Sequence, residues 1–228
     1  MKTNRIKTAK GFKDTFNLYM IKQDSLFGNL ELPYVQKYKG PVPNKLKNYL
    51  STKLKEENTF IHFYLFDYNF DNKDGLWYGS LRDSIYVQKF LNKLKGFGGA
   101  ISPDYSVYVD MPLIMQLWNI YRTRTVCCWL NSIGVNCILN LRWGDYRTYE
   151  VVFSGIAKHS TFSIGSHGLI KNPVQRHIFM NGFQEMLNRL NPEALIIYGP
   201  YTKEMNELCD KYSVKVYHFE SEQTEARR

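Results

Sequence analysis

Short apolar runs alternate along the chain with longer stretches in which apolar residues recur every three or four positions. Runs with the length and composition of buried strands occupy residues 60–66, 100–102, 135–141, 160–164, 194–198 and 214–219. Helical spacing predicts helices over 45–55, 84–95, 112–133, 173–190 and 202–212. This alternation indicates an α/β fold with a mostly parallel central sheet and flanking helices. An open sheet is favoured over a barrel, because six strands fall short of the eight of a full barrel.

The composition divides the chain into three parts. Residues 1–58 form a basic N-terminal arm or extension, which includes the stiff sequence Gly40-Pro41-Val42-Pro43. Residues 59–220 form the α/β domain, and residues 221–228 form a polar tail that we expect to be disordered.

Positive charge is concentrated near the N-terminus. Residues 1–55 contain 12 Lys and Arg residues and three Asp and Glu residues, so this segment carries +9, the net charge of the whole chain. A basic arm on a neutral body is expected of a protein that binds a polyanion, most simply DNA. The candidate nucleic-acid contacts are Lys10, Lys13, Lys45 and Lys47. The alternative is a solvated lysine-rich surface without a partner.

Several classes of protein are not expected. No apolar run approaches the roughly 18 residues of a membrane span, and the basic arm lacks a sustained apolar face for a membrane surface. The four cysteines lack CxxC spacing, which predicts reduced thiols in a cytoplasmic protein. There is no P-loop, dinucleotide fingerprint or nucleophile elbow. We therefore expect neither a metal nor a cofactor, and chemistry carried by carboxylates, histidine and aromatic rings, or binding alone.

Polar and aromatic residues directly follow five of the predicted strands. Because the carboxyl ends of parallel strands share one edge, and ligands bind beyond that edge, we expect these side chains to converge on one cleft. The catalytic candidates are Asp104, His167 and Asp67. The substrate-binding candidates are Tyr105, Arg142, Trp143, Ser166 and Tyr198, whose aromatic rings and guanidinium suit a base and an anion. The alternative is that turns alone require polar residues at strand ends.

Several short stretches then carry a resemblance to a known family. They are Ile61-His62-Phe63 with Asp67-Tyr68-Asn69-Phe70, Ile101-Ser102-Pro103-Asp104-Tyr105-Ser106, Asp110-Met111-Pro112, Tyr121-Arg122-Thr123-Arg124, Arg142-Trp143-Gly144-Asp145, Phe153-Ser154-Gly155-Ile156 and Ile197-Tyr198-Gly199. In order and spacing they resemble a domain-of-unknown-function family carried by bacterial phages, plasmids and integrative elements. Phe66-Asp67 stands where that family often has two adjacent acidic residues. The resemblance implies a phage or mobile-element setting.

Two functions from different classes fit these features. The first is a metal-free DNA glycosylase-like hydrolase, in which Asp104 positions water, Trp143 or Tyr105 stacks on a flipped base, and Arg142 and His167 bind anionic groups. The parallel α/β architecture is similar to that of uracil-DNA-glycosylase-like enzymes, as an analogy of fold only. The second is a DNA-binding or host-defence-interacting phage or plasmid protein without enzymatic activity, which would have a host or phage protein as its partner.

Overall fold

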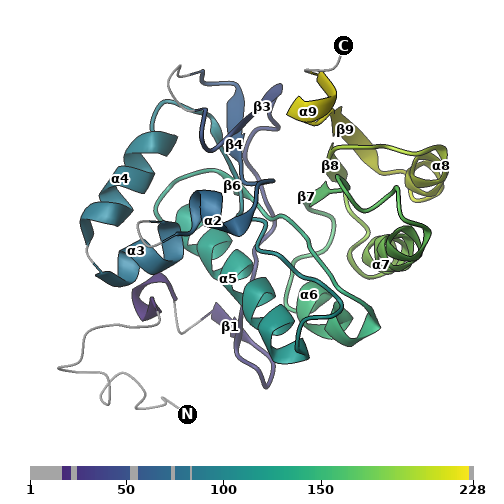
Figure 1. Cartoon of the computed structure of the whole chain (residues 1–228), viewed down its shortest axis with the longest axis horizontal. Coiled ribbons are helices and arrows are strands. Elements are labelled where there is room, and N and C mark those ends of the chain that lie inside the picture. The colour runs from purple at the N-terminus through teal and green to yellow at the C-terminus, as the bar shows by residue number, and fades with distance from the viewer. Residues whose placement is uncertain (1–16, 22–24, 52–55, 73–74, 83, 226–228) are drawn as a thin grey trace.

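Two parallel sheets form the centre of the molecule. The computed structural model describes residues 17–21, 25–51, 56–72, 75–82 and 84–225 (Figure 1). The first sheet contains, in spatial order, β3 (Lys45–Asn48), β4 (Thr59–His62), β5 (Gly99–Ile101) and β6 (Cys137–Ile138). The second contains β7 (Thr161–Gly165), β8 (Ala194–Tyr198) and β9 (Lys215–Phe219). Every adjacent pair within these two sheets is parallel, which confirms the predicted fold class.

A single parallel bridge, between Asn140 and Ser163, joins the two sheets. The N–H of Leu141 donates to the carbonyl of Ser163 at 2.8 Å, and the N–H of Ser163 donates to the carbonyl of Leu139 at 2.9 Å. The strands of both sheets therefore run in the same direction. Their carboxyl ends lie along one common edge, where parallel sheets bind ligands.

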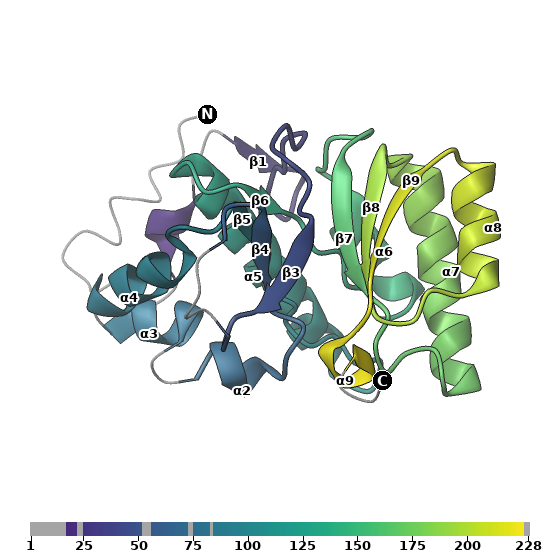
Figure 2. The ribbon, with the colours of Figure 1, turned by 90° about the horizontal axis from the view of Figure 1, so that it is seen from above.

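Helices cover the outer face of this sheet surface. The connections between strands contain α2 (Asp67–Phe70), α3 (Leu76–Arg82), α4 (Ser84–Leu94), α5 (Leu113–Ser132), the 3-10 helix η3 (Tyr146–Thr148), α6 (Tyr149–Phe153), α7 (Pro173–Leu190) and α8 (Lys203–Lys211). Before β3 lie the 3-10 helix η1 (Leu18–Met20) and the antiparallel pair β1 (Leu26–Phe27) and β2 (Leu32–Pro33). Helices α7 and α8 lie on the side of β7–β9 that faces away from β3 and β4 (Figure 2).

The sheet surface is strongly curved. The rings of His62 and Tyr198 lie 4.5 Å apart, although β4 and β8 are four places apart in strand order. On a flat sheet four strand spacings would separate them by about 19 Å. Among the described residues no ladder pairs β3 with β9, so the surface remains open along that seam.

Alternation along the strands produces two apolar clusters. On the concave face, Phe60, Ile101, Ile138 and Ile196 pack together. Their neighbours in sequence, such as Ile61 and Leu139, belong to the larger cluster between the sheets and the helices. Because successive side chains of a strand point to opposite faces, residues two positions further on return to the concave face.

Two local predictions need revision. The predicted helix over 45–55 is wrong: residues 45–48 form strand β3, and residues 52–55 lie outside the described part. Leu46 packs in the concave cluster, whereas Lys45 and Lys47 contact Glu56, which is a period of two rather than 3.6. Residues at the start of the tail expected to be disordered form a short helix, α9 (Glu222–Glu225).

Candidate functional site

Toward the carboxyl edge, the concave face changes from apolar to polar on β4, β6 and β8. Phe60 is followed two residues later by His62, and Ile138 is followed by Asn140. Ile196 is followed in the same way by Tyr198. The same strand alternation that builds the core therefore delivers polar side chains to one end of it.

Asp104 follows β5 and is the carboxylate of this polar layer. Its Oδ1 accepts a hydrogen bond from the Nδ2 of Asn140 at 2.7 Å. Burial raises the pKa of the Asp104 carboxyl, the Arg142 guanidinium acts against that rise, and the Asp67 carboxylate adds to it. Asp104 as a whole residue is partly exposed to solvent. Asp104 is therefore a carboxylate of increased basicity within reach of a ligand.

Tyr64 connects Asp104 to the second sheet. Its hydroxyl donates to the Oδ1 of Asn140 at 3.0 Å and lies 2.6 Å from the Oγ of Ser163, which itself lies 3.3 Å from the carbonyl of Ile196. Burial raises the pKa of the Tyr64 hydroxyl well above its ordinary value, so the hydroxyl stays protonated. Asn140 thus accepts from Tyr64 with its oxygen and donates to Asp104 with its nitrogen, which fixes the orientation of its amide.

His62 is the histidine at the centre of the layer. Only 1% of its surface is exposed, and its Nδ1 accepts a hydrogen bond from the N–H of Tyr64 at 3.2 Å. The proton of the neutral ring is therefore on Nε2, which lies 3.9 Å from the Oε1 of Glu222. Burial lowers the pKa of His62, while Glu222 and Asp104 act in the opposite direction.

Four residues of this layer were not predicted from the sequence: His62, Tyr64, Asn140 and Glu222. Glu222 belongs to the segment predicted to be a tail. Phe60, His62 and Tyr64 are spaced two residues apart, which places all three on one face of an extended strand. This spacing is the sequence signal that could have identified His62 and Tyr64. Glu222 has no local signal, because its partner Asn48 is 174 residues away in sequence.

The structure places Trp143 and Tyr105 away from the site, which corrects their predicted stacking role. Trp143 is 6% exposed and packs against Phe153 and Phe179 beneath the sheet. Arg142 takes the inward position of that strand end, because adjacent residues point to opposite faces. Tyr105 is fully buried, with the guanidinium of Arg122 3.8 Å above its ring.

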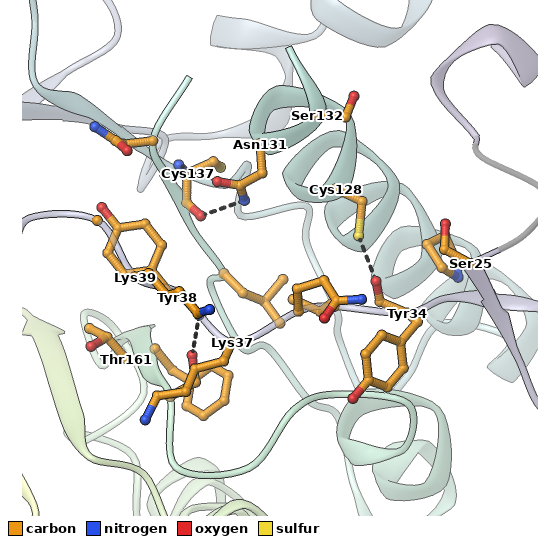
Figure 3. Close-up of a pocket in the computed structure, with 18 of the residues that line it drawn as sticks. Ser25, Tyr34, Lys37, Tyr38, Lys39, Cys128, Asn131, Ser132, Cys137 and Thr161 are labelled. Carbon is orange, nitrogen blue, oxygen red and sulfur yellow. Dashed lines mark hydrogen bonds between the residues drawn. The ribbon is translucent and has the colours of Figure 1, made fainter. Parts of the chain in front are cut away.

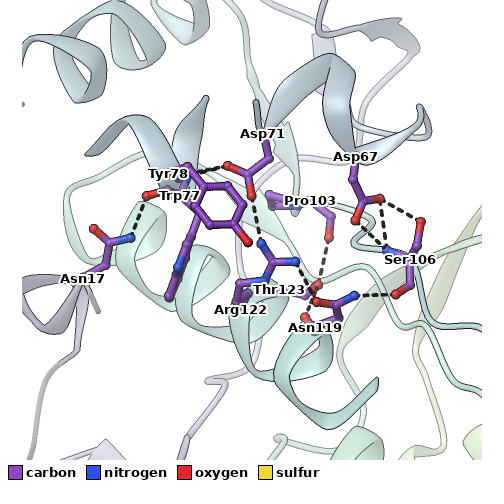
Figure 4. A network of polar contacts seen from close by, with 10 residues as sticks. All are labelled: Asn17, Asp67, Asp71, Trp77, Tyr78, Pro103, Ser106, Asn119, Arg122 and Thr123. Atoms are coloured by element: carbon purple, nitrogen blue, oxygen red, sulfur yellow. Dashed lines mark hydrogen bonds and ion pairs between the residues drawn. The ribbon is translucent and has the colours of Figure 1, made fainter. Parts of the chain in front are cut away.

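Asp67 also lies at the carboxyl edge of the sheet, but its carboxylate binds the loop that contains Ser106. Its Oδ1 accepts hydrogen bonds from the N–H and the hydroxyl of Ser106 at 3.1 and 2.7 Å. The network continues along α5, where Asn119 donates to the carbonyl of Ser106, and Arg122 donates to Asn119 and, at 2.9 Å, to Asp71 (Figure 4). These contacts position the loop that carries Asp104.

The remaining predicted residues lie at the rim or outside the described chain. Ser166 is buried and donates to the carbonyl of Pro200 at 2.7 Å, whereas His167 is exposed. Tyr198 lies inside the site, with its ring 4.7 Å from that of Tyr64. Lys10 and Lys13 fall outside the described residues.

Lys45 and Lys47 form ion pairs with one carboxylate. The Nζ atoms lie 3.7 and 2.7 Å from the side-chain oxygens of Glu56. Glu56 lies one residue beyond the basic segment 1–55, so the charge count of that segment does not include this compensation.

A separate cavity of about 770 Å³ opens at the opposite, amino-terminal edge of the strands (Figure 3). Its lining includes Cys137 and Thr161, which begin β6 and β7. Polar groups there largely satisfy one another: the N–H of Tyr38 donates to the Oγ of Ser160, and the Nδ2 of Asn131 donates to the carbonyl of Cys137. The carboxyl edge is the stronger candidate despite the size of this cavity, because it carries the perturbed carboxyl and imidazole groups.

The described residues show two further features. No helix among them has the length and apolarity to cross a membrane. Within that same part of the chain, no group of three or more His, Cys, Asp or Glu side chains is arranged to hold a metal ion.

Fold and site together define a parallel α/β protein with a carboxylate, amide, tyrosine and histidine network at the carboxyl edge of its sheet. The chain belongs to the family described as "Domain of unknown function (DUF4417)", which matches residues 25–219. This match includes β3, which the sequence analysis had placed in the arm.

Two curated relatives come from mycobacterial phages. The Gene 1 protein of Mycobacterium phage L5 is 32% identical over 139 residues, which cover 61% of this chain and 56% of the relative. The Gene 1 protein of Mycobacterium phage D29 is 31% identical over 148 residues, 64% of this chain and 51% of the relative. The chain thus spans about half the length of these relatives. No solved structure matches the chain.

Proposed function

We propose that this protein is a phage or mobile-element hydrolase that cleaves the N-glycosidic bond of a flipped base, modified or unmodified, in DNA in the cytoplasm. The observation that supports this most directly is Asp104: a partly exposed carboxylate of raised pKa, held by Asn140 at the carboxyl edge of a parallel sheet. The phage origin of the relatives fits a substrate that is phage or host DNA.

The proposed reaction needs one carboxylate and one water molecule. Asp104 accepts a proton from the water molecule while the oxygen of that water molecule bonds to C1′ of the sugar, and Asp104 later releases the proton to solvent. The C1′–N bond breaks, its electron pair leaves with the base, and the base takes a proton from solvent. The negative charge of Asp104 also stabilises the oxocarbenium character that develops on the sugar. The products are a free base and an abasic site.

Other side chains of the edge would bind the substrate. Arg142, which lies close enough to influence the pKa of Asp104 and Tyr64, supplies positive charge for a phosphate or a departing base anion. The partly exposed ring of Tyr64 replaces Trp143 and Tyr105 as the aromatic surface for a base, and the buried ring of Tyr198 supports it from behind. His167, exposed at the rim, provides a further donor.

Alkaline cleavage after incubation tests the reaction. The purified protein is incubated with unmodified duplex DNA and with phage DNA that carries modified bases, and abasic sites are then converted to strand breaks with alkali. We expect breaks with at least one substrate, and their loss in the Asp104→Asn variant, which retains the acceptor for Asn140. Absence of breaks on all substrates would reject the hydrolase.

The second candidate is a binding protein without turnover, which docks on DNA or on a host-defence protein. Phe66 and Tyr68 favour it, because their rings stack 5.9 Å apart while 66% and 68% of their surfaces remain exposed. Exposed aromatic pairs of this kind suit an interface. In that case Phe66→Ala with Tyr68→Ala would weaken binding, and Asp104→Asn would change nothing.

A further inference from the structure

Hydrogen-bond donors converge on the carboxylate of Glu222 at the open seam between β3 and β9. The N–H of Asn48 donates to its Oε1 at 3.3 Å, and the Nδ2 of Asn48 donates to its Oε2 at 2.5 Å. The Nε2 of His62 lies 3.9 Å from Oε1. Glu222 is also anchored through its own N–H, which donates to the hydroxyl of Tyr198 at 3.3 Å.

One of these donors is buried without a hydrogen-bond partner. The Nε2 of His62 carries the ring proton, as argued above, and 3.9 Å is too long for a hydrogen bond. A buried N–H of this kind is unfavourable unless an acceptor reaches it. Glu222 therefore fills the position incompletely: its carboxylate satisfies Asn48 and stops short of His62.

Exposure and a short helix allow the side chain of Glu222 to move away from Asn48 and His62. Its side chain is 48% exposed, and it belongs to the four-residue helix α9 at the end of the described chain. Contact with His62 lowers the pKa of Glu222, so the group that occupies the position is an anion. The arrangement has the composition of an anion site: a backbone N–H, an amide nitrogen and an imidazole N–H around one carboxylate.

We propose that Asn48 and His62 form a binding site for an oxyanion of a ligand, either a phosphate or a carboxylate, and that Glu222 occupies this site in the free protein as an internal competitor. The site adjoins Asp104 through His62 and Tyr64, so a ligand anion bound there would lie beside the polar layer. This inference does not depend on glycosidic bond cleavage.

Removal of the competitor tests the proposal. Inorganic phosphate, and acetate in a parallel series, are titrated at constant ionic strength into the wild-type protein and the Glu222→Gln variant, with NMR signals as the readout. Glu222→Gln removes the charge, keeps the shape and retains the backbone contact with Tyr198. We expect the variant to bind at least one of the two anions about fivefold more tightly, as when a competing state occupies about four fifths of the protein. The anion that gains more identifies the ligand class.

Two controls separate this site from general charge effects. Glu207→Gln on α8 makes the same charge change at an exposed ion pair with Lys203, and must bind as the wild type does. Asn48→Asp in the Glu222→Gln background must abolish the gain, while the new carboxylate can still accept from the N–H groups of Leu50 and Ser51.

The imidazole signal of His62 provides a readout that needs no further substitution. In Glu222→Gln, anion binding must shift this signal with the same dissociation constant as the binding curve. Equal affinities of wild type, Glu222→Gln and Glu207→Gln, or a His62 signal that does not move, would overturn the proposal whatever the outcome of the cleavage assay.

Discussion

The rings of Tyr64 and Tyr198 lie 4.7 Å apart and within 8° of parallel, although Tyr64 follows β4 of one sheet and Tyr198 ends β8 of the other. The contact closes the concave surface at its carboxyl end. It also places the Tyr64 hydroxyl against Asn140 and Ser163, on either side of the bridge that joins the sheets. The curvature of the sheet and the geometry of the candidate site therefore depend on the same pair of rings.

Gly165 gives the first prediction, because it leaves room for that stacking. A Cβ atom at this position would lie 2.8 Å from the Cδ1 and Cε1 atoms of Tyr64. We expect Gly165→Ala to displace the ring and to lower the free energy of unfolding by about 1–3 kcal/mol. Urea denaturation measures the loss. If the variant matches the wild type in stability and in its near-ultraviolet circular dichroism, the stacked arrangement is wrong.

Trp143 is expected to stabilise the protein without contacting substrate. Trp143→Ala should lower the free energy of unfolding by about 3–5 kcal/mol, as do other large truncations in cores. Trp143→Phe should fold and leave DNA binding and cleavage unchanged, since the side chain packs against Phe153 and Phe179. The exposed Tyr146→Ala is the control, with a change within about 0.5 kcal/mol. A folded Trp143→Phe variant that fails to bind DNA would restore the stacking role.

Asp104 should be costly for folding and required for turnover. Burial raises its pKa in the folded state, so the charged form is penalised above that raised pKa, and the penalty disappears as the pH falls below it. We therefore expect Asp104→Asn to be at least as stable as the wild type at pH 8, with the difference shrinking toward pH 4. Urea denaturation at both pH values tests the sign. A clear destabilisation by Asp104→Asn at pH 8 would contradict the direction of the shift.

Arg142 should set the acid limb of the activity profile. A general base is lost as the pH falls through its pKa, and Arg142 acts to lower the pKa of Asp104. Replacement by Gln removes that effect, so the acid limb of the kcat/KM profile should move to higher pH. Arg176→Gln, at an exposed ion pair with Glu204, should leave the limb in place. An unchanged acid limb in Arg142→Gln would contradict an influence of Arg142 on the pKa of Asp104.

Glu56 is expected to limit binding of DNA by Lys45 and Lys47. Glu56→Gln would release both ammonium groups from their ion pairs. If they then contact phosphates, the slope of log affinity against log salt should steepen by about 0.9 for each contact on duplex DNA. Fluorescence anisotropy across a salt series measures the slope. Adding Lys45→Gln and Lys47→Gln to the Glu56→Gln variant must reverse the effect. If the slope of Glu56→Gln equals that of the wild type, neither lysine contacts DNA.

Local pattern was sufficient for much of the fold. Each of the six predicted strands overlaps a strand of the structure, and Asn172 caps α7 through the N–H groups of Val174 and Gln175, as its position before Pro173 indicates. Strand β3 escaped prediction because a short edge strand with a single, partly buried leucine lacks an apolar run. Its assignment depends on pairing with β4, which is a non-local property.

The candidate site was predictable only where it follows from chain direction. Strand direction alone brings Asp104 and Tyr198 to the same edge. The prediction that Trp143 faces the site together with Arg142 failed, because adjacent residues point to opposite faces and the face of each depends on register. The two-residue strand β6 leaves that register undetermined in the sequence. His62 and Glu222 meet only because the sheet curves, and curvature has no signature in a single sequence.

The arginines of the stretch from Tyr121 to Arg124 illustrate the same limit. Arg124 is 1% exposed and donates to four backbone carbonyls, those of Pro33, Val151, Ser154 and Gly155. A guanidinium in this position fastens the segment before β3 to the end of α6. The sequence does not indicate this role, because all four carbonyls belong to residues distant from Arg124 along the chain.

The hydrogen bonds between Asn48 and Glu222 have a consequence for biosynthesis. Its two residues are 174 positions apart, so the contact cannot form until almost the whole domain has emerged from the ribosome. Until then, His62 and Asn48 lack the carboxylate that lies beside them in the folded protein. Loops of this length close slowly, because their entropy is lost before the contact stabilises the chain. The contact at the seam is therefore among the last of the domain to form, because it requires the residues through Glu222.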